Sequence, residues 1–344
     1  MALATIAGAG DLVPYRRLEF PRRSLYGALQ GAFAVANLEA PLTERNDPQR
    51  EGIVLRASPE VVGDLKRAGV DAVSLANNHS GDHGYPGLED TARSCTRERI
   101  IPFGHGRSAL EAFKPCIVPA AVWGGRVDLA LVTATFVGYR RYFAGRGPGV
   151  AGIRVTTAYS RDQERLRFEP GQPAIVHSMA WSQGLRRLRG SIQAARKRTP
   201  LVVAVLHWGV SLQEALLEYQ RAVAESAVEA GASVVLGHHS HTLQGLELRG
   251  GAPVFYGLGS FVFSYPGDYA RRVPRETAVA LVDVDQATGR VERARLRVGR
   301  LDENGEPVAA GAELAAYLAQ KVRRLSAGLG GRIELSGDAL TMIS

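Results

Sequence analysis

Histidine is concentrated at one place in this chain, the run His238-His239-Ser240-His241. Three imidazoles within four residues would repel one another if protonated, and desolvating them costs free energy. A cation, or a nearby carboxylate such as Asp11, removes this problem by keeping the rings neutral or paired. We interpret the run as part of a metal site.

Four other polar runs also lie at the ends of predicted strands. They are Asp11, Asn37-Leu38-Glu39, Asn77-Asn78-His79 and His207. In α/β folds the carboxyl ends of strands converge on one crevice, so we expect these runs to share one metal site with the histidine cluster. Each also has a purely structural reading, since His207 alone fits a buried structural histidine and Asn77-Asn78 fits a turn.

The elements that must position these residues follow from the apolar pattern. Short apolar runs alternate with helical segments, which predicts an α/β fold. Ser58 before Pro59 begins one predicted helix, which ends before Gly69, and a second ends before Gly231. The predicted helices cover residues 58–68, 218–230 and 312–327, and the predicted strands cover residues 3–7, 32–36, 72–76, 127–133, 201–206, 233–236, 253–256 and 277–284.

Composition excludes several classes of protein. Of 344 residues, 45% are hydrophobic and 22% charged, which excludes a disordered chain. The net charge is +8 and almost all basic residues are arginines, a skew typical of GC-rich genomes that does not by itself indicate nucleic-acid binding. Cys95 and Cys116 are too few for a disulfide framework and lack metal-site spacing. With no apolar run long enough to span a bilayer and no signal-peptide pattern, we expect a cytoplasmic protein with no membrane or nucleic-acid partner.

The polar motifs together resemble those of the CapA-type proteins, the PGA_cap family named for capsular poly-gamma-glutamate synthesis. The motifs occur in family order and cover about residues 5–265. They are Gly10-Asp11, Asn37-Leu38-Glu39, the run from Ala76 to Gly84, His207-Trp208-Gly209, the run from Gly237 to His241, and the run from Tyr256 to Phe261.

This resemblance implies the calcineurin-like metallophosphoesterase fold, a two-sheet β-sandwich flanked by helices. We expect one such domain over residues 1–300, with a loop-rich and basic-helix insertion at about 138–199. A C-terminal helix and a loose tail would follow over residues 301–344.

Carried over by position, the resemblance also implies site roles. The expected metal-facing residues are Asp11, Glu39, Asn78, His207, His239 and His241. His79 matches the histidine that acts on substrate beside the metal, and Asp82 matches the aspartate of the same motif. We expect two His–Asp pairs, His79 with Asp82 and His239 with Asp11, to act as acid and base.

The first motif departs from true phosphoesterases in a way that bears on metal number. Leu12-Val13 follows Asp11 where those enzymes have the Asp-x-His that helps hold a second metal. We therefore expect one divalent ion. The mixed oxygen and imidazole ligands suit Mn²⁺ or Zn²⁺, and Ca²⁺ or Mg²⁺ if some histidines bind only through water.

Three enzymatic functions compete on this basis. The main hypothesis is peptide epimerisation, because the family includes a branch associated with lasso-peptide biosynthesis that inverts the Cα of a C-terminal residue of a ribosomal precursor peptide, and this arginine-rich chain resembles that branch. The alternatives are a metallophosphoesterase, weakened by the incomplete second metal site, and a capsule poly-gamma-glutamate biosynthesis protein. The latter is weakened because Asp11 lies so near Met1 that no anchor or export signal fits before it. A non-enzymatic binding module is a fourth option.

The substrate-binding candidates are Tyr139, Arg140, Arg141, Tyr142 and Trp208. Aromatic side chains can receive an apolar group, and arginine can hold a peptide carboxylate through two hydrogen bonds. A surface loop with one aromatic ring in the core explains the Tyr139–Tyr142 run equally well. We interpret the basic run between Arg186 and Arg198 as the solvated face of a helix.

Overall fold

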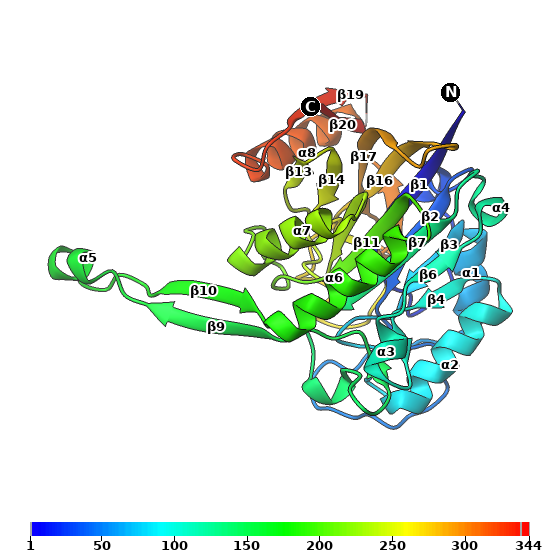
Figure 1. Cartoon of the computed structure of the whole chain (residues 1–344), viewed down its shortest axis with the longest axis horizontal. Coiled ribbons are helices and arrows are strands. Elements are labelled where there is room, and N and C mark those ends of the chain that lie inside the picture. Colours follow the sequence, from blue (N-terminus) through cyan, green and yellow to red (C-terminus); the bar gives the residue numbers. More distant parts are fainter. Residues whose placement is uncertain (1, 338, 344) are drawn as a thin grey trace.

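The apolar runs form strands whose two faces are both buried, as expected for sheets covered on both sides. The computed structural model describes residues 2–337 and 339–343. It contains two large β-sheets with helices on their outer faces (Figure 1). The expected α/β fold class, a two-sheet β-sandwich flanked by helices, is confirmed.

The first sheet has the strand order β19-β20-β17-β16-β1-β2-β3-β4, with β15 paired to β1 and β18 paired to β17. Its strands β1, β2, β3, β4 and β15 run parallel, and the others join antiparallel. The bounds are β1 Leu3–Val13, β2 Phe33–Leu38, β3 Val70–Ser74, β4 Ile101–Phe103, β15 Ser260–Phe263, β16 Glu276–Asp285, β17 Val291–Leu301, β18 Pro307–Ala309, β19 Arg332–Ser336 and β20 Ala339–Ile343.

The second sheet has the order β13-β14-β12-β11-β7-β6. The crossover from β7 to β11 contains α6, and that from β11 to β12 contains α7, so these three strands run parallel. The bounds are β6 Cys116–Val118, β7 Leu129–Thr135, β11 Leu201–His207, β12 Val234–His238, β13 Leu246–Arg249 and β14 Ala252–Phe255.

The helices are α1 Val62–Arg67, α2 Gly84–Arg97, α3 Ala109–Ala112, α4 Ala120–Trp123, α5 Gln163–Phe168, α6 Ser182–Arg196, α7 Glu218–Ala230 and α8 Ala312–Leu325. Short 3₁₀ turns cover Leu25–Ala28, Pro59–Val61 and Arg140–Tyr142. None of the helices that the structure describes is long and apolar enough to cross a bilayer.

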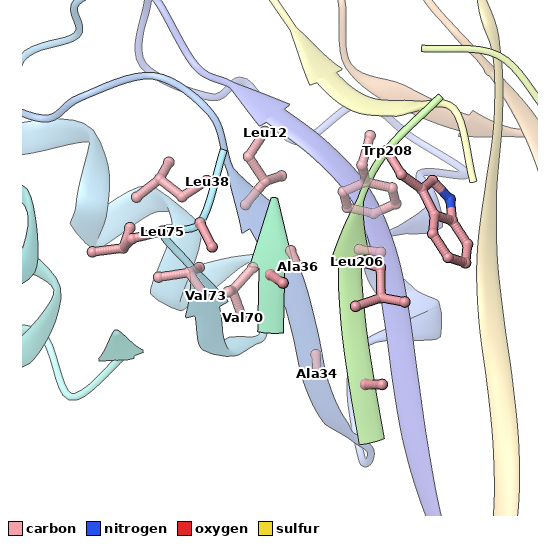
Figure 2. Packing of buried hydrophobic residues seen from close by; sticks show 14 of the residues in the cluster. Leu12, Ala34, Ala36, Leu38, Val70, Val73, Leu75, Leu206 and Trp208 are labelled. Carbon is pink, nitrogen blue, oxygen red and sulfur yellow. The ribbon is translucent and has the colours of Figure 1, made fainter. Parts of the chain in front are cut away.

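Two groups of apolar side chains stabilise the sandwich. Ile6 and Val35 from the first sheet and Val203 and Leu236 from the second belong to one buried cluster. Neighbouring positions on the same strands belong to the other cluster, together with residues of α1, α6 and α7. Figure 2 shows part of it, with side chains from β1, β2, β3 and β11. Each of these strands therefore contributes to both clusters by alternation of its side chains.

Gly10, in the first polar run, must be a glycine because the backbone before β15 passes close to it. A Cβ atom on Gly10 would lie 2.0 Å from the carbonyl oxygen of Gly259, just before β15. Only glycine allows β15 to lie against β1 at this point.

The predicted helices and strands lie where the structure has them. Some strands are longer than predicted because hydrogen bonding to a neighbouring strand continues past the predicted end. The strand predicted to end at Asp11 continues to Val13, because Leu12 pairs with both β2 and β15. The helix predicted over 218–230 is α7 with the same bounds, and Gly231 ends it in the left-handed conformation with φ of 111°.

Two segments differ from expectation. The expected loose tail instead forms the β19–β20 hairpin, which extends the first sheet by pairing with β17. Within residues 138–199, where a loop-rich segment was expected before a basic helix, β9 (Val155–Ser160) and β10 (Ile175–Ala180) form a two-stranded arm that carries α5 at its tip and projects from the body (Figure 1). The basic helix that follows is α6.

Candidate metal centre

Strand register brings the polar runs together at the carboxyl ends of both sheets. Asp11 on β1 lies opposite Asn37 on β2, and His207 on β11 lies opposite His238 on β12. The loop after β12 carries His239 and His241. The site therefore draws its residues from two sheets rather than from the crevice of one.

Three of the six predicted metal-facing residues converge on one point. Atoms of Glu39, His239 and His241 lie within 4.8 Å of one another, and all three residues are buried. Both Glu39 carboxylate oxygens and the Nδ1 atom of His239 have no hydrogen-bond partner. Unpartnered buried polar atoms are costly, so their convergence fits a bound divalent cation that would satisfy them.

Burial sets the protonation of this cluster. It lowers the pKa of His239 to about 3 and that of His241 to about 4, which keeps both rings neutral and able to bind a metal at pH 7. Burial, together with the charges of Asp11 and Asp82, raises the pKa of Glu39 well above its usual value. A cation beside Glu39 would reverse that effect by favouring the carboxylate.

The other three predicted ligands lie beside this cluster and are bonded to their neighbours. Nδ2 of Asn37 donates to Oδ1 of Asp11 at 2.8 Å and lies 3.2 Å from Nδ1 of His207. Nε2 of His207 lies 2.7 Å from Oδ1 of Asn78. Nε2 of His207 is also 3.7 Å from Oε1 of Glu39, so this network adjoins the cluster. Asp11, Asn78 and His207 hold one another in place in this structure.

One of the two expected His–Asp pairs is present. Nδ1 of His79 lies 2.7 Å from Oδ2 of Asp82, and the backbone N–H of Leu55 donates to the same oxygen at 2.8 Å. The other carboxylate oxygen of Asp82 lies 3.4 Å from Nε of Arg50. The His79 ring is thus oriented by a fully buried carboxylate while its own side chain stays 10% exposed.

The other expected pair takes a different form. Oδ2 of Asp11 accepts from the backbone N–H of His239 at 3.0 Å, while the His239 Nδ1 atom is unpartnered. The ring nearest to Asp11 in this loop is His241, whose Nδ1 lies 3.5 Å from Oδ2. The reason is the loop backbone, which adopts positive φ at His239 (87°) and His241 (52°). Such conformations cost about 1–3 kcal/mol each and are typical of functional sites.

Four of the five substrate-binding candidates lie on one segment after β7. The Arg141 guanidinium lies over the rings of Tyr139 and Tyr142, at 4.7 and 5.2 Å from their centroids, and donates to the Gln49 carbonyl. Tyr142 packs against Gly81 of the loop that carries His79 and Asp82. This places Tyr139, Arg141 and Tyr142 beside the His79–Asp82 pair.

Arg140, on the same segment, and Trp208 do not lie beside this pair. Arg140 lines a separate pocket together with Phe143 and Arg187. Trp208 is wholly buried, with its indole stacked on Tyr256 and its Nε1 donating to the Tyr256 carbonyl at 2.8 Å. The expectation that Trp208 contacts substrate is wrong in this structure, because the residue after β11 points into the core.

Three residues that sequence reasoning did not select lie against the site. Arg50 contacts Asp82, and Oγ of Ser260 lies 3.1 Å from Nδ1 of His241. The third residue is Tyr269, whose pKa is raised by burial and by the charges of Glu39 and Asp11. Ser260 belongs to a quoted motif, so its position could have been inferred from the resemblance. Arg50 and Tyr269 lie in loops with no sequence pattern that marks them.

Known proteins are similar to this chain over most of its length. Residues 21–265 match the family described as "Bacterial capsule synthesis protein PGA_cap". The chain is 30% identical over 233 residues to the PGA biosynthesis protein CapA of Bacillus subtilis, covering 67% of this chain and 53% of that protein. It is 27% identical over 235 residues to the capsule biosynthesis protein CapA of Bacillus anthracis, covering 67% and 50%.

The chain thus spans about half the length of these curated relatives. Among solved structures, a novel phosphatase from Mycoplasma pneumoniae is similar, with a TM-score of 0.49 and 11% identity over 87% of this chain and 94% of that one. The family match covers well over half of the sequence and includes each polar run of the site, apart from Asp11, which lies just before it. This protein belongs to the PGA_cap family of bacterial capsule synthesis proteins.

Proposed function

We propose that this protein is a metal-dependent enzyme that performs acid–base chemistry on an amide-linked chain carrying carboxylates, as in poly-gamma-glutamate. The observation that carries the proposal is the convergence of Glu39, His239 and His241, with unpartnered atoms, next to the His79–Asp82 pair. The names of the relatives, which refer to capsule and PGA biosynthesis, favour this class of substrate.

The chemistry divides between the cluster and the pair. A divalent ion bound by Glu39, His239 and His241 would supply positive charge to polarise a carbonyl oxygen or a water. The Asp82 carboxylate accepts a hydrogen bond from Nδ1 of His79. Nε2 of that ring is therefore left to take or give a proton. The carboxylate fixes the ring's orientation and tautomer.

Cationic side chains beside the pair support an acidic substrate. Arg50 reaches Asp82 from a largely buried position, and the exposed Arg141 lies on the two tyrosine rings. A guanidinium held on an aromatic face keeps its N–H edge available for a carboxylate. Arg141, which forms no ion pair among the described residues, therefore supports a carboxylate-bearing substrate such as polyglutamate.

Inversion of a peptide Cα is the second candidate, and one arrangement favours it. His79 and His239 come from different sheets, and each has a ring nitrogen that is not bonded to a neighbouring side chain. Inversion needs a base and a proton donor on opposite faces of the carbon, with positive charge to stabilise the enolate. A precursor peptide, such as that of a lasso peptide, would be the substrate of this reaction.

Phosphate-ester hydrolysis is less well supported. Among the described residues, the converging group offers one carboxylate and two imidazoles, a set suited to one ion. In-line displacement at phosphorus is best served by two metals about 3.5–4 Å apart.

The test uses metal-loaded protein in D₂O with three substrates. They are a gamma-linked glutamate hexamer, an alpha-linked peptide with a free carboxyl terminus, and an aryl phosphate. Mass spectrometry should detect metal-dependent cleavage or transfer of the hexamer; deuterium at one Cα of the peptide instead would select the epimerase. His79→Ala should abolish either reaction, whereas His177→Ala, which changes a histidine of the β9–β10 arm, should leave it intact. Fast aryl phosphate hydrolysis with neither of the other reactions would overturn the proposal.

A further inference from the structure

A pocket of about 200 Å³ lies where the β9–β10 arm joins the body of the protein. Its walls come from the segment after β7, the base of the arm and the first turns of α6. Three arginines line it, and none of its lining residues is acidic. The residues that matter are Arg140, Phe143, Arg154, Trp181, Gln183 and Arg187.

Arg154 is held in place at the base of this pocket. Its guanidinium lies 3.5 Å from the centroid of the Trp181 ring. That ring is fixed in turn, because Trp181 Nε1 donates to Oγ1 of Thr156 at 2.6 Å and its backbone N–H donates to the Arg154 carbonyl at 2.8 Å. A guanidinium stacked on a fixed indole loses little freedom when its N–H edge binds a planar anion.

The charges of the pocket are uncompensated. Many arginines of this protein pair with carboxylates, as Arg17 does with Asp64 and Arg189 with Glu229. In the part of the chain that the structure describes, Arg140, Arg154 and Arg187 have no such partner. Three like charges around one small pocket create a positive potential that favours an anionic ligand.

The pocket lies close to the candidate metal centre. Phe143 forms one of its walls, and a Cβ atom on Gly138 would lie 3.5 Å from the Phe143 ring and 3.1 Å from Cα of Asn78. Asn78 in turn contacts His207 beside the metal cluster. Phe143 and Gly138 thus join the wall of the pocket to the loop of the site that carries Asn78.

We infer that this three-arginine pocket is a subsite that binds a carboxylate of the acidic amide-linked substrate while another residue of the same chain lies at the metal centre. The inference rests on the proposed function for its substrate class. The pocket volume suits one acidic side chain, and the planar guanidinium of Arg154 suits the two oxygens of a carboxylate. Arg140, from the segment after β7, and Arg187, from α6, add further charge to its lining.

The experiment is fluorescence anisotropy with a fluorescein-labelled gamma-linked glutamate hexamer. Arg154→Gln and the double variant Arg140→Gln with Arg187→Gln should each weaken binding about tenfold or more, because each removes charge-assisted hydrogen bonds. Arg186→Gln is the matched control, since it removes an exposed arginine of α6 that does not line the pocket. A glutamine hexamer should bind poorly to every protein.

Binding is measured on metal-loaded protein and on the His79→Ala variant, which separates this inference from the proposed function. If no substrate is turned over but hexamer affinity depends on Arg154, the subsite stands and the proposed function fails. If turnover occurs but the arginine variants bind the hexamer like Arg186→Gln, the subsite is overturned. Competition by inorganic phosphate as strong as by glutarate, a dicarboxylate, would also overturn the assignment to carboxylates.

Discussion

Asp11 and Asn37 lie opposite each other on neighbouring parallel strands, and the Asn37 amide donates a 2.8 Å hydrogen bond to the Asp11 carboxylate. The backbone N–H of His239 binds the other oxygen of Asp11. Both Asp11 oxygens therefore accept a hydrogen bond, while neither oxygen of Glu39 accepts one. Strand register thus makes Glu39 the carboxylate most available to a metal and Asp11 a residue that fixes the histidine loop.

This division of roles predicts different effects of two variants. Glu39→Gln should abolish binding of Mn²⁺ or Zn²⁺ because it removes the one free carboxylate of the cluster. Asp11→Asn should weaken binding by about 10–100-fold, as expected for a residue that orients ligands. Calorimetric titration of both variants checks the prediction, and equal losses in the two would contradict it.

Metal binding should release protons, in increasing number as the pH is lowered from neutrality. The raised pKa of Glu39 favours a protonated metal-free carboxyl whose proton the cation must displace, whereas the lowered pKa values of His239 and His241 mean that their rings release none at neutral pH. Titrations in two buffers with different ionisation enthalpies give the number of protons. Glu39→Gln cannot release this proton; if that variant still bound metal and released it, the assignment to Glu39 would be refuted.

Protein stripped of metal should lose stability as the pH falls from about 6.5 to about 4. The histidines of an unfolded chain bind protons below 6.5, but burial lowers the folded-state pKa to about 3 for His239 and about 4 for His241, and lowers that of His207 as well. The unfolded state therefore binds more protons in this range, so the free energy of unfolding decreases as the pH decreases. The raised pKa of Glu39 acts in the opposite direction above 4.5, but it is one group against the five histidines whose pKa burial lowers, namely His83, His105, His207, His239 and His241.

Urea denaturation of chelated protein at pH 7 and pH 5 measures this slope. His239→Gln should reduce it, because the variant removes one of the buried imidazoles whose pKa is lowered. A midpoint that is higher at pH 5 than at pH 7 would contradict the prediction.

Asp82→Asn should leave metal content unchanged and lower the turnover number about 10²–10⁴-fold, the usual contribution of a positioned acid or base. An asparagine can keep the hydrogen bond from the Leu55 N–H but cannot stabilise a protonated His79 ring. Asp90→Asn, at a carboxylate of α2 that binds Arg45, is the control for loss of an ion pair. Normal turnover by Asp82→Asn would show that the pair is only structural.

Gly10→Ala should destabilise the fold strongly, by about 3 kcal/mol or more, because the new methyl group would overlap the Gly259 carbonyl. Gly63→Ala is the control. Gly63 lies in α1 with nothing within 4 Å of an added Cβ, so that change should stabilise the helix by about 0.5–1 kcal/mol. Thermal unfolding of the two variants should therefore shift in opposite directions.

The sequence predicted the strands of the two sheets best where apolar residues are consecutive, as in β2 and β11. Such runs indicate strands buried on both faces, and the polar residues that end them indicate a site at one edge. The β9–β10 arm was missed because its strands are largely exposed, so that no buried face imposes an alternating pattern on their apolar and polar residues.

The detailed geometry of the site depends on relations that a single sequence does not contain. Trp208 follows His207 directly, yet Trp208 points into the core and His207 points toward the metal cluster. The turn after β11 decides these two directions. The pairing of Asp11 with the His239 backbone rather than with its ring depends on the positive φ of that loop. Arg50 contacts Asp82 across loops far apart in the sequence.

The central claim is that Glu39, His239 and His241 hold a divalent cation beside the His79–Asp82 pair. Anomalous X-ray diffraction from crystals grown with Mn²⁺ tests it most directly. The account predicts one strong anomalous peak per chain, bonded to a Glu39 oxygen and to an imidazole nitrogen of each of the two histidines. Crystals soaked in Mn²⁺ with no peak at this cluster, or with a peak elsewhere and these three side chains unmoved, would contradict it.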